Sequence, residues 1–209
     1  MQKKKGFRFG ADTILLSDFA GDKTFRKLLD IGTGSGIIPI LLCQKYGSAK
    51  AVGIEILEEY ADMAARSAAL CKMEGRIRII HADAINAKDH LKGEQYDLIT
   101  CNPPYFKKTQ TISASHTLID MARSSDTLTP QAIARIAAGF LQTAGRLCVV
   151  LPAYRFLEMC DAVRAHGIEP KRVRFIQDAI EKPPYLFLLE SIRSAKPGLH
   201  YEPVHITRS

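Results

Sequence analysis

The stretch "LLDIGTGSGI", residues 28–37, decides the fold of this 209-residue chain. An apolar run ends close to Asp30, and three glycines follow at alternate positions from Gly32 to Gly36. Glycines at such a place let a chain turn sharply from a strand into a helix and bring its backbone against a ligand. The stretch therefore predicts a strand over residues 26–32 and a helix over residues 36–47.

The rest of the chain alternates in the same way between apolar runs and helical segments. Continuous apolar strands separated by helices are typical of a parallel sheet covered on both faces. The last two strands have no room for a helix between them, which predicts an antiparallel hairpin at the sheet edge. Thr129 is expected to cap a helix whose first residue is Pro130. Further strands are expected at 49–56, 76–83, 96–102, 146–152, 171–177 and 185–193, and further helices at 57–73, 129–145 and 154–167.

Composition indicates one domain and an anionic partner. The chain is 46% hydrophobic, carries a formal net charge of +7 and has a sequence pI of about 9.2. This balance favours nucleic acid as a partner, although an ordinary basic enzyme can have the same composition. No apolar run approaches membrane-spanning length, so a cytoplasmic protein that avoids membranes is expected.

The cysteines and histidines predict neither disulfides nor a metal site. Five cysteines occur without any CxxC spacing, and Cys43, Cys101 and Cys148 lie in apolar runs, which indicates buried free thiols. The six histidines form no HxxxH or HExxH pattern, so no metal is expected.

The glycine turn resembles a dinucleotide fingerprint but departs from it. That fingerprint needs a third glycine at position 37, where this chain has Ile37. The amino-acid end and ribose of S-adenosyl-L-methionine fit a GxGxG turn instead. Glu55 ends the second strand, where an acid can hold ribose hydroxyls, and Asp83 ends the third, where it can face the adenine amino group. We therefore prefer S-adenosylmethionine to NAD, with a donor site that comprises Asp30, Gly32, Thr33, Gly34, Gly36, Glu55, Ile56, Asp83, Ala84 and Asn102.

The second informative stretch is "TCNPPYF", residues 100–106, at the end of the fourth strand. "NPPY" resembles the [DN]PP[YF] motif of class I methyltransferases that act on planar amino nitrogens. The lone pair of such a nitrogen is delocalised, and two acceptors can draw its hydrogens toward tetrahedral geometry. The side-chain oxygen of Asn102 and the carbonyl of Pro103 would supply them, beside the rigid Pro104. Tyr105 offers a face for base stacking, worth ~1–3 kcal/mol per base.

The predicted strands agree with that resemblance. Class I methyltransferases have a Rossmann-like α/β fold with a seven-stranded, mostly parallel sheet, helices on both faces and the last strand inserted antiparallel. A single domain over residues 1–209 is expected. Residues 1–25 would face the donor and RNA, and residues 105–129 would form a substrate loop, because long connections usually bind ligands.

The N-terminal run "QKKKGFRFGADTILLSDFA" (2–20), "NPPYF" and the later "KPG" (196–198) together resemble the bacterial tRNA1(Val) (adenine(37)-N6)-methyltransferase family. The resemblance implies methylation of an adenine beside the anticodon of a valine tRNA. It also implies that "RFGAD" packs over the donor, which would place Phe9 and Asp12 near it. From the residues alone, Asp12 is equally suited to cap a helix. Where the family commonly has "ARHE", this chain has "ARSS" at 122–125.

The basic residues fall into two groups. One group flanks the expected mouth of the site and could hold RNA phosphates: Lys3, Lys4, Lys5, Arg8, Lys107 and Lys108. The other group, Lys171, Arg172 and Arg174, is expected to form a solvated edge.

Three other functions share these features. NPPY enzymes also methylate a glutamine side chain in proteins or guanine N2 in rRNA. A module that only binds RNA, with a degenerate methyltransferase fold, is a non-enzymatic alternative, and the intact residues from Asn102 to Tyr105 argue against it. A monomer is expected.

Overall fold

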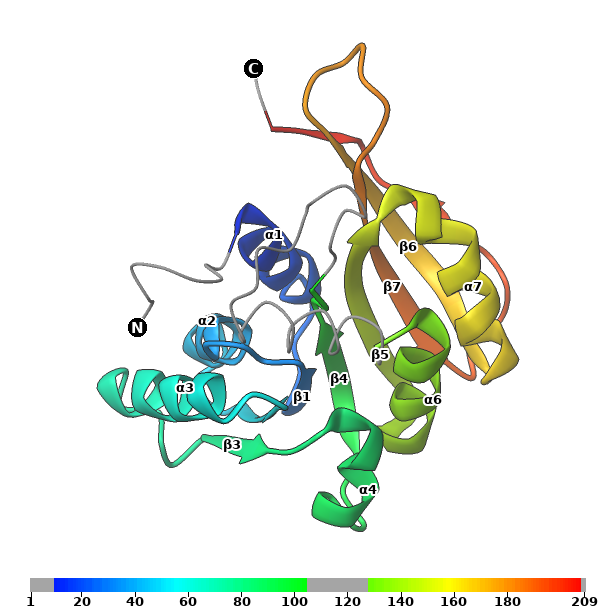
Figure 1. Cartoon of the computed structure of the whole chain (residues 1–209). Coiled ribbons are helices and arrows are strands. Elements are labelled where there is room, and N and C mark those ends of the chain that lie inside the picture. The colour runs from blue at the N-terminus through cyan, green and yellow to red at the C-terminus, as the bar shows by residue number, and fades with distance from the viewer. Residues whose placement is uncertain (1–9, 105–127, 208–209) are drawn as a thin grey trace, which may run out of the picture.

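The computed structural model describes residues 10–104 and 128–207, which fold around one mixed sheet (Figure 1). The sheet has nine strands in the order β3-β2-β1-β4-β5-β7-β6-β8, and β9 also pairs with β6. The elements are α1 (Ala11–Ala20), β1 (Lys27–Ile31), α2 (Ile37–Lys45), β2 (Lys50–Glu55), α3 (Glu58–Leu70), β3 (Ile77–His81), η1 (Ala84–Asn86), α4 (Ala87–His90), β4 (Tyr96–Cys101), α6 (Pro130–Phe140), β5 (Leu141–Pro152), η2 (Ala153–Arg155), α7 (Phe156–Ala165), β6 (Ile168–Gln177), β7 (Leu186–Arg193), β8 (His200–Tyr201) and β9 (His205–Ile206).

The arrangement of the seven longer strands confirms the predicted fold class. Strands β1 to β5 pair in parallel, whereas β7 runs antiparallel to both β5 and β6. Two two-residue strands, β8 and β9, add to this core and were not predicted. The strand order reverses between β1 and β4, and in such sheets ligands bind outside the carboxyl ends of the strands at that point.

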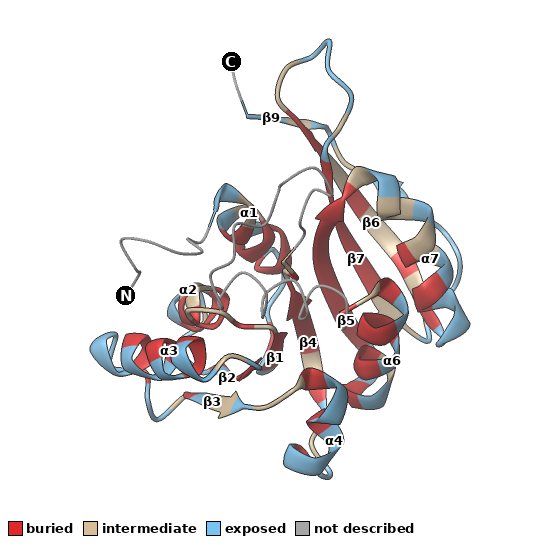
Figure 2. Cartoon of the chain, in the orientation of Figure 1, coloured by how far each residue is buried: buried red, intermediate tan, exposed pale blue. Residues whose placement is uncertain are grey.

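Consecutive apolar residues of a strand pack into two separate hydrophobic cores, because side chains alternate between the two faces of a sheet. Leu28 joins the core under α1, α2 and α3, whereas Leu29 joins the core under α4, α6 and α7. Leu98 and Ile99 divide in the same way on β4. Figure 2 shows the resulting buried stripes along the central strands. Both faces are therefore covered, as the continuous apolar runs predicted.

One helix begins at the predicted signal, and another ends close to its predicted bound at residue 167. The Thr129 side chain accepts a hydrogen bond from the Ala132 N–H, and Pro130 is the first residue of α6. Gly167 follows α7 with a φ of 70°. At the start of α1, however, Gly10 occupies the capping position and Asp12 lies within the first turn. The alternative interpretation of Asp12 as the helix cap was therefore wrong.

The predicted helix over 129–145 is too long, because α6 ends at Phe140 and β5 begins at Leu141. Leu141 pairs with Tyr96, and the register then shifts so that Arg146 pairs with Leu98. Ala144 within the shifted segment has a φ of 61°, which no α-helix accommodates. Pairing with β4 overrides the local helical periodicity here.

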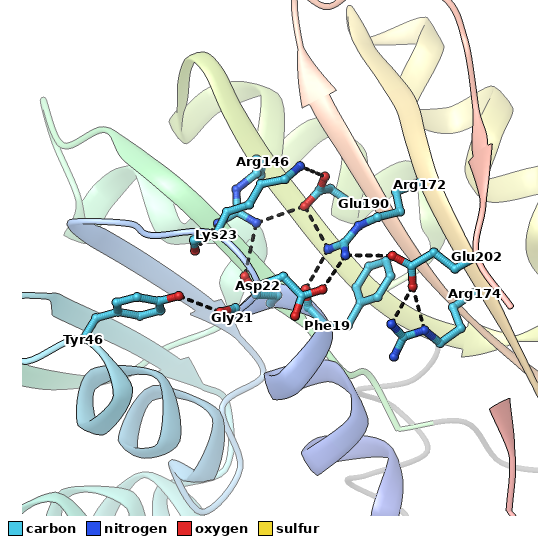
Figure 3. A network of polar contacts seen from close by, with 11 residues as sticks. Phe19, Gly21, Asp22, Lys23, Tyr46, Arg146, Arg172, Arg174, Glu190 and Glu202 are labelled. Atoms are coloured by element: carbon cyan, nitrogen blue, oxygen red, sulfur yellow. Dashed lines mark hydrogen bonds and ion pairs between the residues drawn. The ribbon is translucent and has the colours of Figure 1, made fainter. Parts of the chain in front are cut away.

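An ion-pair network on the sheet corrects the prediction of a solvated edge at Arg172 (Figure 3). The Arg172 side chain is only 11% exposed and bonds to Asp22, Glu190 and Glu202. It is buried because β6 is not the outermost strand: β8 pairs beside it at Arg172 itself. Arg174 is paired with Glu202, and Lys171 donates to the Lys196 carbonyl.

Candidate functional site

The glycine turn between β1 and α2 has the strained backbone that its sequence predicts. Gly32, Gly34 and Gly36 have φ values of 69°, 56° and 78°. The N–H groups of Gly32 and Thr33 both donate to the Ile54 carbonyl on β2, at 2.9 and 3.0 Å. L-residues rarely adopt such φ values, so glycine is needed for the turn.

Two of these glycines have different surroundings. A Cβ at Gly34 would meet no atom within 4 Å, so the backbone there borders open space. A Cβ at Gly36 would lie 3.1 Å from the Cβ of Ala64, so this glycine lets α2 and α3 approach closely. The turn therefore has one glycine that faces the space available to a ligand and one that packs two helices.

Three of the predicted motifs meet at neighbouring strand ends. Ile31 pairs with both Ile54 and Cys101, so Gly32, Glu55 and Asn102 follow at adjoining positions on β1, β2 and β4. The carboxyl edge of the sheet thereby joins the glycine turn, the acid of the second strand and the NPPY motif.

The Glu55 carboxylate holds the glycine turn in place. Its Oε2 accepts from the Gly34 N–H at 2.8 Å and its Oε1 from the Leu57 N–H at 3.0 Å. Glu55 is 7% exposed, and this burial raises the pKa of its carboxyl although the hydrogen bonds oppose the shift. Each oxygen keeps acceptor capacity, because a carboxylate has about four lone-pair sites.

Asp30 lies beneath the turn and does not line the cavity above it. Its Oδ1 accepts from Thr100 Oγ1 at 2.6 Å, and its buried Oδ2 has no hydrogen-bond partner within residues 10–104 and 128–207. Burial raises the pKa of Asp30 to about 7, although the hydroxyls of Thr100 and of Thr33 in the turn lower it. An unsatisfied carboxylate oxygen this close to the turn suits a cationic group.

Asp83 and Ala84 follow β3 at the same edge. Asp83 Oδ1 accepts from the Ile85 N–H at 3.0 Å and so caps the short 3-10 helix η1. The Asp83 side chain is half-buried and lines the cavity, and its second oxygen is not used in this cap. Asp83 is thus a capping residue that can still face a ligand.

A cavity runs along this edge between the strand ends and the N-terminus of α3. It continues into a smaller space over the turn, which shares Gly32, Gly34, Tyr60 and Asn102 with it and adds Thr13 and Thr33. The larger part is lined by Gly32, Gly34, Ile54, Glu55, Ile56, Leu57, Tyr60, Ala82, Asp83, Ala84, Asn102, Pro104 and Leu128.

Asn102 lies at the junction of both parts of the cavity. Its Nδ2 donates to Thr13 Oγ1 on α1 at 3.1 Å, a contact between residues 89 positions apart in the chain (Figure 1 shows α1 beside the end of β4). Thr13 is 6% exposed. Thr13, Leu57, Tyr60 and Leu128 also line the cavity but carried no local signal that would have identified them from the sequence.

The fold brings most of the residues predicted for the donor site to the cavity. The predicted residues on the cavity are Gly32, Thr33, Gly34, Glu55, Ile56, Asp83, Ala84, Asn102 and Pro104, whereas Asp30, Gly36 and Pro103 do not line it. Asp12 is on α1 but is not a lining residue. The predicted residues Lys3, Lys4, Lys5, Arg8, Phe9, Tyr105, Lys107 and Lys108, and most of the loop 105–129, lie outside the described residues.

The described part of the chain contains no group of three or more histidine, cysteine, aspartate or glutamate side chains arranged to bind a metal ion. In the same residues, no helix has the length and apolar character needed to cross a membrane. Cys43, Cys101 and Cys148 are free and buried, as predicted.

Solved structures share the fold at low sequence identity. A predicted O-methyltransferase from Agrobacterium tumefaciens aligns with a TM-score of 0.74 and 19% identity, over 93% of this chain and 86% of that chain. TrmN from Thermus thermophilus aligns with a TM-score of 0.63 and 19% identity, over 87% of this chain and 48% of that chain. These similarities support the class I methyltransferase fold.

Sequence comparisons show the family. Residues 9–166 match the model of the methyltransferase small domain. A tRNA1(Val) (adenine(37)-N6)-methyltransferase from Pedobacter heparinus is 31% identical over 93% of this chain and 81% of its own length. The enzyme of the same name from Parabacteroides distasonis is 28% identical over 98% of this chain and 84% of its own length. The chain therefore belongs to the methyltransferase small domain family and, within it, to the family of the tRNA1(Val) (adenine(37)-N6)-methyltransferases.

Proposed function

We propose that this chain methylates N6 of an adenine in tRNA with S-adenosylmethionine as donor, and that the target is adenine 37 of tRNA1(Val). The observation that carries this proposal is the position of Asn102 and Pro103. Asn102 follows β4 directly and lines the cavity built from the glycine turn and Glu55, and the buried Pro103 comes next in the chain. The names of the relatives supply the particular tRNA and nucleotide.

The residues present fit the donor. Glu55 would hold the ribose hydroxyls with its remaining lone pairs, and Asp83 would accept from the adenine amino group. The open space at Gly34 admits the chain of the amino acid, and the unsatisfied Asp30 Oδ2 beneath the turn favours its ammonium. Ile56 and Leu57 supply apolar surface for the purine. When bound, the donor supplies a methyl group on a positively charged sulfur, which needs no further activation.

The chain's own residues then act on the acceptor nitrogen. Asn102 Oδ1 and the Pro103 carbonyl would accept the two hydrogens of the adenine amine and draw its lone pair toward the methyl group. The donor would give up its methyl–sulfur bond as the nitrogen–methyl bond formed, and one amine proton would leave to water. The two rigid prolines fix the carbonyl, so alignment rather than a strong base drives the step.

The remaining features of the proposal concern the partner and setting. The basic residues Lys3, Lys4, Lys5, Arg8, Lys107 and Lys108 would contact phosphates near the target, and Tyr105 would stack on the extruded base. We further propose that the chain acts as a monomer in the cytoplasm.

Methyl transfer from labelled donor to unmodified transcripts tests the function. We expect label in tRNA1(Val) but not in the same transcript with guanine at position 37, and digestion to nucleosides should yield N6-methyladenosine. Asn102→Ala should reduce the label by at least about 100-fold, because the aligning acceptor is lost.

Each alternative has its own result in this assay. N2-methylguanosine in rRNA or a methylated glutamine in a release-factor protein, with tRNA unlabelled, would replace the proposal by the corresponding enzyme. Binding of tRNA without any donor binding in calorimetry would favour the module that only binds RNA.

A further inference from the structure

We propose that Thr13 is a positioning residue that orients the Asn102 amide for methyl transfer. This inference rests on the proposed function, because it assumes an amine as acceptor. Asn102 Nδ2 donates to Thr13 Oγ1 at 3.1 Å, and the Thr13 side chain is buried. Both residues line the part of the cavity that lies over the glycine turn.

The chemistry requires one orientation of this amide. An asparagine side chain has an oxygen that accepts and an NH₂ group that donates, at nearly equal positions. Only the oxygen can accept a hydrogen from the target amine. Since Nδ2 is engaged by Thr13, Oδ1 is on the opposite side of the planar amide. A rotation by half a turn would place Oδ1 against the Thr13 hydroxyl, which can also donate, and would present NH₂ to the amine, where two donors repel each other.

Thr13 can act as a fixed point because α1 is firmly held at its other end (Figure 3). The last carbonyls of a helix have no partner within the helix and need others. Here the Phe19 carbonyl accepts from Arg172 Nη2 at 2.7 Å and the Ala20 carbonyl from Arg146 Nη1 at 3.1 Å. Just beyond the helix, the Gly21 carbonyl accepts from the Tyr46 hydroxyl at 2.6 Å.

The same two arginines are anchored to the sheet. Arg146 and Arg172 both pair with Glu190 on β7, which is 1% exposed. The Arg172 guanidinium also lies over the Phe19 ring, with Cζ 3.9 Å from the centroid. Only about 1.7 turns of helix, or about 9 Å, separate Thr13 from Phe19. A short rigid segment therefore links a buried ion-pair network to the side chain that contacts Asn102.

Ser17 provides a matched control on the same helix. It lies one turn after Thr13, is 4% exposed, and its hydroxyl donates to the Thr13 carbonyl at 2.8 Å. Ser17→Ala removes a buried hydroxyl of the same helix without altering the group that Asn102 contacts. Thr13→Val removes the hydroxyl at constant shape, and Thr13→Ser restores it with one methyl group less.

Steady-state kinetics on unmodified tRNA1(Val) transcript tests the role. We expect Thr13→Val to lower kcat by about 10- to 100-fold, the loss typical of a misaligned reacting group. Thr13→Ser should recover most of this loss, and Ser17→Ala should keep the wild-type kcat. The dissociation constant of the donor should be unchanged in all three variants. A wild-type kcat in Thr13→Val would overturn the proposal.

A double-mutant cycle with Asn102→Asp separates orientation from structural damage. A carboxylate presents an acceptor in either orientation, so a chain that carries Asn102→Asp has no need of Thr13 to choose one. We expect Thr13→Val to lower the kcat of Asn102→Asp by no more than about 3-fold, against its much larger effect on the wild type. Equal losses in both backgrounds would show that Thr13 acts only on the fold.

A spectroscopic measurement keeps the test independent of turnover. In a protein with ¹⁵N-labelled asparagine, the side-chain signals of Asn102 are those that disappear in Asn102→Asp. Thr13→Val should shift them, whereas Ser17→Ala should not; unshifted signals in Thr13→Val would count against the contact. If the wild type leaves every tRNA unlabelled, the proposed function fails, and these spectra alone decide whether Thr13 holds the amide.

Discussion

Thr100 Oγ1 lies 2.6 Å from Asp30 Oδ1, a hydrogen bond that joins β4 and β1 at the point where the strand order reverses. Thr100 is fully buried and Asp30 is 1% exposed. A neutral hydroxyl compensates a buried carboxylate far less than a cation would. The hydrogen bond therefore links β1 to β4 beside the cavity. The charge of the Asp30 carboxyl, however, depends on whether a cationic group is bound near the glycine turn.

The first prediction concerns stability and pH. Because burial raises the pKa of Asp30 from 3.8 to about 7, the folded chain keeps a proton that the unfolded chain releases in this window. The contribution of Asp30 to the free energy of unfolding is thus present at low pH and lost as pH rises to about 7. Replacing it by asparagine should remove this loss, which is at most ~4 kcal/mol.

Urea unfolding of wild type and Asp30→Asn at several pH values from about 4 to about 8 measures the effect. The stability of the variant relative to wild type should rise across this range. The exposed Asp18 on α1 offers a control, since Asp18→Asn removes a charge without emptying a buried site. Parallel curves for wild type and Asp30→Asn would mean that Asp30 is ionised throughout.

The second prediction concerns donor binding. An ammonium close to the turn stabilises the ionised form of Asp30, so binding should release a proton while Asp30 is still protonated. The donor should therefore bind more tightly as pH rises through about 7, where the pKa of Asp30 lies. Calorimetry in two buffers of different ionisation enthalpy detects the released proton. Asp30→Asn should abolish both the release and the pH dependence, and proton release that persists in this variant would assign it to another group.

The third prediction contrasts two glycines of the turn. Gly34→Ala should weaken donor binding by about 10-fold or more, because the added methyl enters open space beside the cavity, and should cost only ~1–2 kcal/mol of stability for the left-handed backbone. Gly36→Ala adds a clash with Ala64 to a similar backbone cost, so we expect a stability loss of about 2–4 kcal/mol.

Calorimetry with the donor and urea unfolding on both glycine variants provide the comparison. Each variant serves as the control for the other, since both place alanine at a positive φ. A reversed ranking, with binding lost mainly in Gly36→Ala, would contradict the division of roles in the turn.

The fourth prediction concerns Glu190. Burial alone would raise the pKa of this carboxyl, but hydrogen bonds from Lys23 and Arg146 lower it overall. Its stabilising effect is therefore present above the ordinary pKa of 4.5 and is lost as pH falls below it. Glu190→Gln leaves Arg146 and Arg172 buried without their shared anion, which should destabilise the chain by ~3–5 kcal/mol at neutral pH.

Glu158→Gln is the control for the Glu190 variant, because Glu158 pairs with Arg155 at 2.8 Å on the surface. Breaking an exposed pair should cost less than ~1 kcal/mol. Urea unfolding at neutral pH and at several pH values below 4.5 should show the difference between wild type and Glu190→Gln narrowing as pH falls through the lowered pKa of Glu190. Equal effects of the two substitutions would show that burial adds nothing at Glu190.

The fold, and the grouping of the predicted residues around one cavity, were largely predictable from sequence because local patterns determine them. The spacing of Gly32, Gly34 and Gly36 requires a particular turn, and continuous apolar strands require two covered faces. Acids at successive strand ends meet because parallel strands share one carboxyl edge. Glu55 has one role that was not predicted: besides lining the cavity, its carboxylate accepts a hydrogen bond from the Gly34 N–H of the turn.

Contacts between distant segments could not be predicted in this way. Thr13 meets Asn102 across 89 positions, and nothing in a helix of ordinary composition marks one threonine among its neighbours. Arg172 looked like a surface cation because its partners Asp22, Glu190 and Glu202 come from three other segments. At Leu141, pairing with Tyr96 overrode a local pattern that favoured helix.

The short strands β8 and β9 pair with the part of β6 between Arg172 and Gln177, with Arg172 opposite His200 and Gln177 opposite Ile206. An uncovered edge strand offers unpaired backbone groups to a strand of another copy, so we expect residues 199–207 to limit self-association. Deleting residues 199–207 should therefore expose the backbone N–H and C=O groups of β6 and allow copies of the chain to associate. Light scattering of the shortened chain should then show a mass that grows with concentration, whereas the full chain should not.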